Sequence, residues 1–180
     1  RGALLYIEGQ PQRIYGDTVD VENTPAGALS IGVKSLPKTW TTGTRLLVWR
    51  PSTADWIRSL GCESFGGGQR MGYWAWHPGD IDLRWNRRIM SYKGNTLALD
   101  APVTLSIEQR WGGAKAVAYT QPGLLERCGV ENLTLESDYD RTLPKDENHC
   151  WDGVSITDAE NCWVRMVTFR HFAGSSVVVG

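Results

Sequence analysis

The segment DENHCWDG, which runs from Asp146 to Gly153, carries side chains suited to acid–base chemistry and to metal binding. It contains His149, and a second histidine, His171, follows 22 residues later. A neutral imidazole can act as a general base or as a metal ligand. Two imidazolium ions about 5 Å apart would repel by roughly 3 kcal/mol at an effective dielectric near 20, so we expect at least one ring to be neutral if the two lie close together.

Charged residues near the two histidines suggest how an anionic substrate would be handled. Arg170 could pair with a uronate carboxylate while His149 or His171 removes the proton α to it, as β-elimination requires. The candidate catalytic residues are therefore His149, His171, Arg170 and Asp152. In the alternative interpretation the histidines form a stacked polar ladder, and Arg170 makes a surface salt bridge to Asp152 or Glu136.

The acidic segment DYDRTLPKDEN, residues 138–148, has the composition of a loop that can line a cleft. Candidate substrate-binding residues in and beside it are Asp138, Asp140, Arg141 and Trp151. A hydrolase would use two carboxylates from this loop and Asp152, and their separation would distinguish inverting from retaining chemistry. Asp146 and Glu147 are the candidate ligands for Ca²⁺, although the spacing is not that of an EF-hand. Alternatively, the segment is a solvated acidic loop.

Tryptophan is unusually frequent, with nine residues, of which seven lie between positions 40 and 111. Trp74 and Trp76 are separated by one residue, so a strand would place both rings on one face. Flat aromatic faces can stack on sugar rings, and these two residues are further candidates for substrate binding. Alternatively, the tryptophans fill the core of a small module that has few other large apolar side chains.

Composition limits the class of protein. The 180 residues are 41% hydrophobic and 22% charged, with a net charge of −1, which fits one domain or one domain with a small insert. This balance gives no attraction to nucleic acid or to an anionic membrane, and no apolar run approaches the roughly 20 residues of a membrane span. The four cysteines form no C-x-x-C pair, which argues against a zinc ribbon.

Short strands separated by Gly, Pro, Asn and Asp dominate the pattern and predict an all-β chain. One helix is expected over Ser52–Leu60, where a capping Ser or Thr precedes an acid. Lys93-Gly94-Asn95, between two alternating strands, predicts a tight hairpin turn.

Two internal repeats organise the end of the chain. Residues 126–137 align with 160–171 at an offset of 34, with Val130 over Val164. Residues 149–157 align with 171–179 at an offset of 22. The two offsets agree if the acidic loop bulges out of one coil. Coils of this length that stack about 4.8 Å apart predict a parallel β-helix, with His149 and His171 on adjacent coils.

These segments resemble a known family. GVENLTLES, DGVSIT and NCWVRMVTFRHFAGS are similar to coils of right-handed parallel β-helix proteins of the pectin-lyase-like superfamily. PAGALSIGV, TGTRLLVWRPST and NRRIMSYKGNTLALDAP resemble the small β-module that interrupts some secreted bacterial members. We therefore expect an all-β, right-handed parallel β-helix (solenoid) fragment with an inserted antiparallel β-barrel-like module. The expected limits are 1–24 for the first β-helix strands, 25–112 for the module and 113–180 for the coils, truncated at the C-terminus.

The resemblance implies a carbohydrate-active protein that acts on an acidic polysaccharide, with β-elimination as the first hypothesis. The alternatives are a polysaccharide hydrolase, or a non-catalytic glycan-binding or structural β-helix such as an adhesin or tailspike part. The partner would be a polysaccharide or glycan, with no nucleic acid and no membrane span, and the location secreted, periplasmic or cell-surface. The sequence leaves open the substrate, the oligomeric state and whether the protein is an enzyme.

Overall fold

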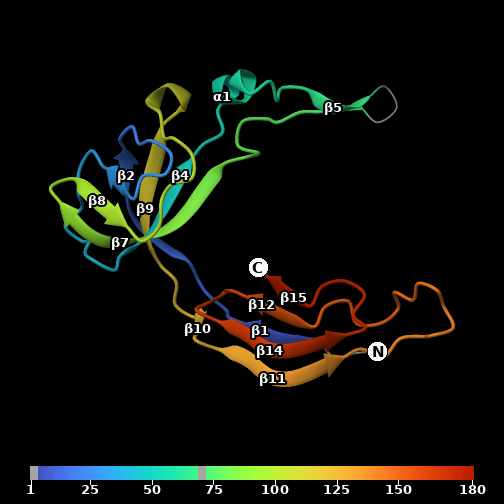
Figure 1. Ribbon diagram of the computed structural model, residues 1–180. Coiled ribbons are helices and arrows are strands. Elements are labelled where there is room, and N and C mark those ends of the chain that lie inside the picture. Colours follow the sequence, from blue (N-terminus) through green and yellow to red (C-terminus); the bar gives the residue numbers. More distant parts are fainter. Residues whose placement is uncertain (1–3, 69–71) are drawn as a thin grey trace. The chain divides into compact units, whose positions relative to one another are not determined.

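The computed structural model describes residues 4–68 and 72–180, and these residues divide into two compact units (Figure 1). The parallel unit comprises residues 1–13 and 121–180, and the antiparallel unit comprises residues 14–120. Strands dominate both units, which confirms the all-β prediction. No helix in the described part of the chain is long and apolar enough to cross a bilayer.

The antiparallel unit is built on a six-stranded sheet with the order β2-β9-β4-β7-β8-β3. Its strands are β2 (Ile14–Val21), β3 (Ser30–Gly32), β4 (Arg45–Arg50), β7 (Leu83–Lys93), β8 (Thr96–Leu99) and β9 (Ala114–Thr120). The edge strands meet at a single bridge between Val21 and Val33, and the described strands form no closed barrel. The unit is also wider than the expected 25–112, because β2 and β9 lie outside that range and pair with each other inside this sheet.

The core of this unit lies on one face of the curled sheet. In β4, Leu46 and Val48 are fully buried, as alternate residues of a half-buried strand should be. Trp40 and Trp85 are also core residues, which supports the packing interpretation for part of the tryptophan set. The expected hairpin is present: Lys93 pairs with Thr96, and the turn contains Gly94 in the left-handed region, at φ 57°.

Short elements lie beyond the sheet of the antiparallel unit. The helix α1 (Ala54–Ser59) confirms the predicted helix, and the Thr53 hydroxyl caps it by accepting a hydrogen bond from the Trp56 amide. A small hairpin of β5 (Phe65–Gly68) and β6 (Gly72–Trp74) follows the helix, and a 3₁₀ turn, η1 (Gln109–Trp111), precedes β9.

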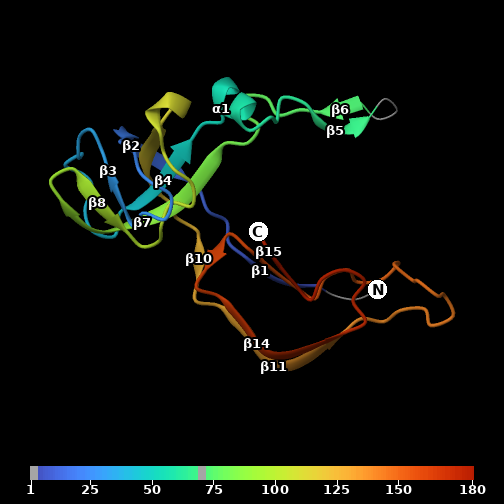
Figure 2. The same cartoon turned by 45° about the horizontal axis from the view of Figure 1, so that its top comes forward.

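The parallel unit consists of strands that pair only in parallel (Figures 1 and 2). Three sets are formed: β1 (Leu5–Glu8) with β12 (Val154–Thr157) and β15 (Val177–Val179), β10 (Leu125–Glu126) with β13 (Ala159–Glu160), and β11 (Gly129–Glu136) with β14 (Trp163–Arg170). Val130 pairs with Val164 and Glu126 with Glu160, so the offset of 34 is confirmed.

The second predicted offset is wrong by one residue. Val154 pairs with Val177 and Ser155 with Val178, which makes the offset between β12 and β15 23 rather than 22. A slip of one residue reverses the face on which each side chain lies, so it matters for the site. Beyond β11, the Ser137 amide donates to the Arg170 carbonyl at 3.0 Å, so the offset of 34 continues and His171 lies opposite Ser137 rather than opposite His149. His149 and His171 are therefore not equivalent positions on adjacent coils.

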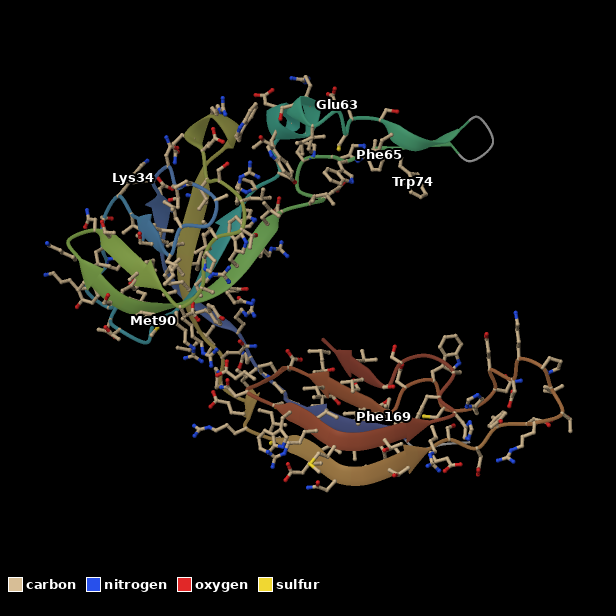
Figure 3. The ribbon with its side chains drawn as sticks, in the orientation of Figure 1. Lys34, Glu63, Phe65, Trp74, Met90 and Phe169 are labelled. Carbon is tan, nitrogen blue, oxygen red and sulfur yellow. The ribbon has the colours of Figure 1, made fainter. Side chains whose placement is uncertain are left out.

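A matched bend in β11 and β14 explains how apolar residues on both sides of it reach one core. Asn132 and Met166 occupy the left-handed region at φ 58° and 53°, and the register skips both of them. The bend resets the alternation, so that Val130 is buried and Phe169, farther along, packs against the same core (Figure 3). Arg165 consequently points outward and pairs with Glu131.

Candidate functional site

The acidic loop between β11 and β12 projects beyond the ends of the strands (Figure 1) and is held together by its own carboxylates. Asp146 Oδ2 accepts from the Asp140 amide at 2.7 Å, and Oδ1 accepts from the Asn148 amide at 2.9 Å. These hydrogen bonds, that from Asp140 first, lower the pKa of Asp146. Asp140 in turn accepts from the Thr142 hydroxyl and amide, which lowers its own pKa. Both carboxylates are therefore ionised and committed to loop structure at neutral pH.

His149 is fixed at the base of this loop by both ring nitrogens. Its Nε2 lies 3.0 Å from the Asp146 carbonyl oxygen, and its Nδ1 lies 3.0 Å from the Ser137 hydroxyl oxygen. A carbonyl oxygen only accepts, so Nε2 carries a proton, and in a neutral ring Nδ1 accepts from the hydroxyl. With both nitrogens engaged, His149 has no free lone pair for proton abstraction.

Tyr139 brings the two histidines together, although the predicted ladder does not. Its ring centroid lies 5.9 Å from that of His149 and 4.8 Å from that of His171. The Arg141 guanidinium carbon lies 5.7 Å from the same centroid, within the range of a cation–π contact. Sequence reasoning missed Tyr139, although an aromatic residue in an otherwise polar loop was a usable signal.

Arg170 and His171 share one carboxylate on the outer side of β11. Arg170 Nη1 lies 3.8 Å from Glu136 Oε2, and His171 Nε2 lies 3.7 Å from Glu136 Oε1. The geometry thus matches the salt-bridge alternative for Arg170. Asp152 is engaged elsewhere, because its Oδ1 accepts from the Ser175 amide at 3.0 Å.

An open depression of about 330 Å³ lies on the acidic loop. Its lining consists of Asp138, Tyr139, Asp140, Leu143, Asp146, Asn148 and His149. Three of these residues are aspartates, so the local field repels a uronate or a sulfate. The Asp138 carboxylate and the Asn148 side-chain amide instead suit the hydroxyl groups of a neutral ligand.

Trp151 provides an immobilised aromatic face beside the loop. Its indole Nε1 donates to the Glu147 carbonyl at 3.1 Å, while 53% of the residue stays exposed. Gly174 lies against the ring, since a Cβ built there would be 3.1 Å from Trp151 Cε3. The hydrogen bond and the backbone contact fix the orientation of the ring and leave much of its surface open.

Trp74 and Trp76 belong to the antiparallel unit and both pack on Phe65. The centroid distances from Phe65 are 6.4 Å to Trp74 and 5.7 Å to Trp76. Figure 3 labels Phe65 and Trp74. Trp76 also stacks on Trp56 at 6.4 Å, whereas Trp74 is 60% exposed. Trp76 is therefore mainly a packing residue, and Trp74 is the more accessible of the pair.

The described residues contain no group of three or more His, Cys, Asp and Glu side chains arranged to hold a metal ion. The binding of Ca²⁺ by Asp146 and Glu147 stays a prediction, since the hydrogen bond at Glu147 involves its backbone carbonyl and not its carboxylate. Both carboxylate oxygens of Asp146 accept backbone hydrogen bonds, and the Glu147 carbonyl accepts from Trp151.

Loop order is expected to depend on the ionisation of Asp146. Folding lowers the pKa of Asp146. Its carboxylate therefore stabilises the folded loop at pH values above the pKa of the unfolded chain, and this contribution is lost as the pH falls through the lower pKa of the folded state. The amide chemical shifts of Asp140 and Asn148, followed by NMR, should therefore titrate with a midpoint below 3.8. Asp146→Asn should abolish this titration at the Asn148 amide, whereas Asp138→Asn should leave it in place; the Asp140 amide also reports the titration of its own carboxyl. A midpoint at or above 3.8 would contradict the assigned role.

Comparison with known proteins gives structural similarities only. No family model and no curated protein matches the chain. Similar solved structures include the tailspike gp49 of Pseudomonas phage LKA1 (13% identity, TM-score 0.39, 86% of this chain and 20% of that one). The tailspike gp61 of Pseudomonas phage phi297 is 9% identical, with a TM-score of 0.45 over 89% of this chain and 21% of that one. The tailspike gp54 of Acinetobacter baumannii bacteriophage AP22, in complex with capsular saccharide, is 8% identical, with a TM-score of 0.41 over 89% of this chain and 25% of that one.

The chain thus spans between a fifth and a quarter of the length of these tailspikes. At these identities and TM-scores no function is transferred from them.

Proposed function

We propose that the protein binds a glycan at the loop face, defined as the acidic loop, which contains Tyr139, together with Trp151. The observation that carries this proposal is the half-exposed Trp151 ring, fixed by its hydrogen bond to Glu147 and by its contact with Gly174. A ring that is already immobilised loses little conformational entropy when a sugar stacks on it. The neighbouring depression supplies carboxylate and amide groups for sugar hydroxyls.

The charge of the loop face favours a neutral glycan over the acidic polysaccharide expected from the sequence. Asp138, Asp140 and Asp146 line the depression, and the Glu136 carboxylate lies within 4 Å of both Arg170 and His171. A uronate carboxylate approaching Arg170 would therefore compete with a carboxylate already in place. The nearby positive charge is partly neutralised before any ligand arrives.

Binding fits the geometry better than either catalytic alternative. Elimination needs a base with an available lone pair, whereas both ring nitrogens of His149 are engaged and the Nε2 of His171 faces the Glu136 carboxylate at 3.7 Å. Hydrolysis needs a general acid with a raised pKa, whereas the pKa values of Asp140 and Asp146 are lowered. Neither requirement applies to a glycan-binding surface.

The finer description of the fold is part of the same proposal. Three sets of parallel strands, the repeated offset of 34 and the matched bends at Asn132 and Met166 support coils of a parallel β-helix. We place this helix in the pectin-lyase-like superfamily, with a secreted or cell-surface location. Stacked coils would hold the acidic loop and Trp151 at one edge of a rigid scaffold.

The experiment that tests the function is a binding screen against matched neutral and uronate polysaccharides, with product analysis on the same samples. We expect retention on neutral glycans, no gain in ultraviolet absorbance from unsaturated uronates and no new reducing ends. Tight binding confined to uronate polymers would contradict the charge argument. Release of unsaturated or shortened products would overturn the non-catalytic assignment.

A further inference from the structure

The antiparallel unit contains a buried arginine that the loop face does not use. Arg50 ends β4 and follows the buried Leu46 and Val48 at alternate positions, so its side chain continues the inner face of that strand. Only 2% of the residue is exposed. Its Nε and Nη1 atoms are buried and have no hydrogen-bond partner among the described residues.

The charge of Arg50 is only partly balanced by its neighbours. Its guanidinium carbon lies 4.6 Å from the centroid of the Trp56 ring, in a cation–π contact. Burial lowers the pKa of Arg50, and the field of Glu108 opposes this effect. Glu108 gives no direct hydrogen bond, because its Oε1 accepts from the Ser106 hydroxyl at 2.9 Å and its Oε2 pairs with Arg110 at 2.6 Å.

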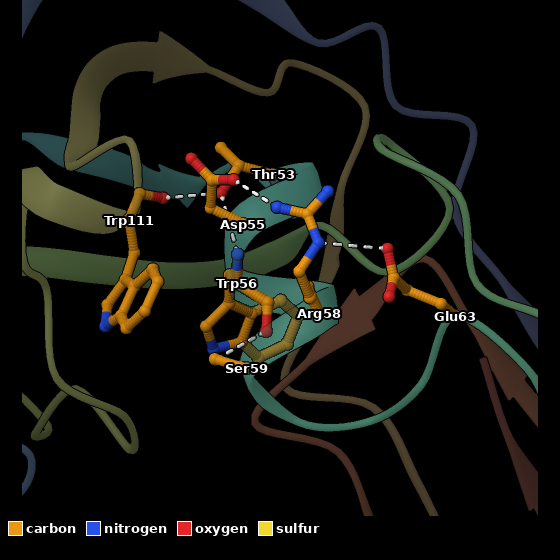
Figure 4. Close-up of polar contacts among 7 residues, drawn as sticks. All are labelled: Thr53, Asp55, Trp56, Arg58, Ser59, Glu63 and Trp111. Carbon is orange, nitrogen blue, oxygen red and sulfur yellow. Dashed lines mark hydrogen bonds and ion pairs between the residues drawn. The ribbon is translucent and has the colours of Figure 1, made fainter.

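A cavity of about 170 Å³ is lined in part by Arg50. The residues that matter for its chemistry are Arg50, Trp56, Trp111, Leu60, Ser106 and Glu108. Its frame is tied together by Thr53, whose hydroxyl donates to the Trp111 carbonyl at 3.2 Å and caps α1 (Figure 4). The cavity therefore joins a buried cation, aromatic and aliphatic walls, and hydroxyl groups within one packed framework.

We propose that this cavity, the Arg50 pocket, binds the carboxylate of an acidic sugar. An unpartnered buried cation is costly, and a carboxylate would pair with it and supply acceptors for its donors. Glu108 in the lining disfavours a doubly charged phosphate relative to a singly charged carboxylate. Trp111 and Leu60 offer apolar contacts to the carbon skeleton that bears the group. The acidic ligand expected from the sequence would thus bind in the antiparallel unit rather than on the acidic loop.

The test is a calorimetric titration of the full chain with sodium glucuronate, glucose and inorganic phosphate in parallel. Glucuronate should bind more tightly than either of the others. Arg50→Met, which keeps the length of the side chain, should weaken glucuronate binding by about tenfold or more, since a charged hydrogen bond is lost. It should not impair folding, because it removes an unpaired buried charge. Glu108→Gln should tighten binding.

Two control variants show whether glucuronate binding depends on this pocket. Arg58→Met removes an exposed arginine of α1, the helix that carries Trp56; Arg58 pairs with Asp55 and Glu63 (Figure 4), and its replacement should leave glucuronate binding unchanged. Trp151→Ala should also leave it unchanged, since the pocket does not depend on the loop face. Absence of glucuronate binding, equal binding of phosphate, or full binding by Arg50→Met would overturn the proposal.

Discussion

Replacing Gly9 by alanine is expected to destabilise the parallel unit by about 3 kcal/mol, the upper end of typical overpacking costs. A Cβ at Gly9 would overlap the carbonyl oxygen of Asp158 and lie 2.9 Å from the Leu125 amide nitrogen. Both are backbone atoms, so no side-chain rotation can relieve the clash. The Asp158 carbonyl also accepts the Leu125 amide at 3.2 Å, and moving it would break a link between neighbouring rungs.

Chemical denaturation followed by circular dichroism would measure this loss. Gly16→Ala is the matched control, since a Cβ at that glycine meets its nearest atom, the Ala118 carbonyl oxygen, at an ordinary 3.7 Å. We expect the control to lie within about 0.5 kcal/mol of the unmodified protein. Equal stabilities for the two variants would show that Gly9 is not closely packed between the strands.

Replacing Trp151 by alanine is expected to weaken glycan binding by about thirtyfold, or about 2 kcal/mol, as for a central aromatic residue of a binding surface. The indole is fixed by Glu147 and Gly174 before the ligand arrives, so its removal forfeits both contact area and preorganisation. Trp151→Phe should lose less affinity than Trp151→Ala, because an aromatic face remains. It should still bind more weakly than the unmodified protein, because the hydrogen bond to Glu147 is lost. Calorimetry with the best neutral oligosaccharide of the screen would give the affinities.

Trp163 provides the matched control for this measurement. It is 41% exposed, donates from Nε1 to Glu131 at 3.3 Å and also lies over a glycine, Gly129. Trp163 lies at the start of β14, opposite the start of β11, whereas the acidic loop follows the end of β11. Trp163 is therefore at the other end of these paired strands, and Trp163→Ala should leave the affinity unchanged. Similar losses in Trp151→Ala and Trp163→Ala would mean that binding is spread over the unit rather than centred on the loop face.

The local pattern of the sequence predicted the strands, the helix and the hairpin, because each depends on neighbours in the chain. The offset of 34 was also readable, since paired residues such as Val130 and Val164 or Thr134 and Thr168 are alike. The predicted offset of 22 was wrong because His149 and His171 match in the sequence alignment but are not paired in the register of the strands. The register places Val154 opposite Val177, at an offset of 23, and His171 opposite Ser137.

The candidate sites were harder to predict because they depend on which donors each group meets in the fold. Nothing local to Asp146 shows that both of its oxygens accept backbone amides, or that His149 has no free nitrogen. Arg50 was overlooked, although its position two residues after Val48 in RLLVWR placed it on the buried face of β4. Position along an alternating strand is the signal that could have identified it.

The most direct test of glycan binding at the loop face is an NMR titration of the indole Nε1–H signals with the neutral oligosaccharide that binds most tightly in the screen. Trp151→Phe assigns the Trp151 signal by its disappearance, and Trp163→Phe assigns the control. We expect a dose-dependent shift of the Trp151 signal while that of Trp163 stays in place. Glycan binding that leaves the Trp151 signal unmoved would contradict binding at the loop face.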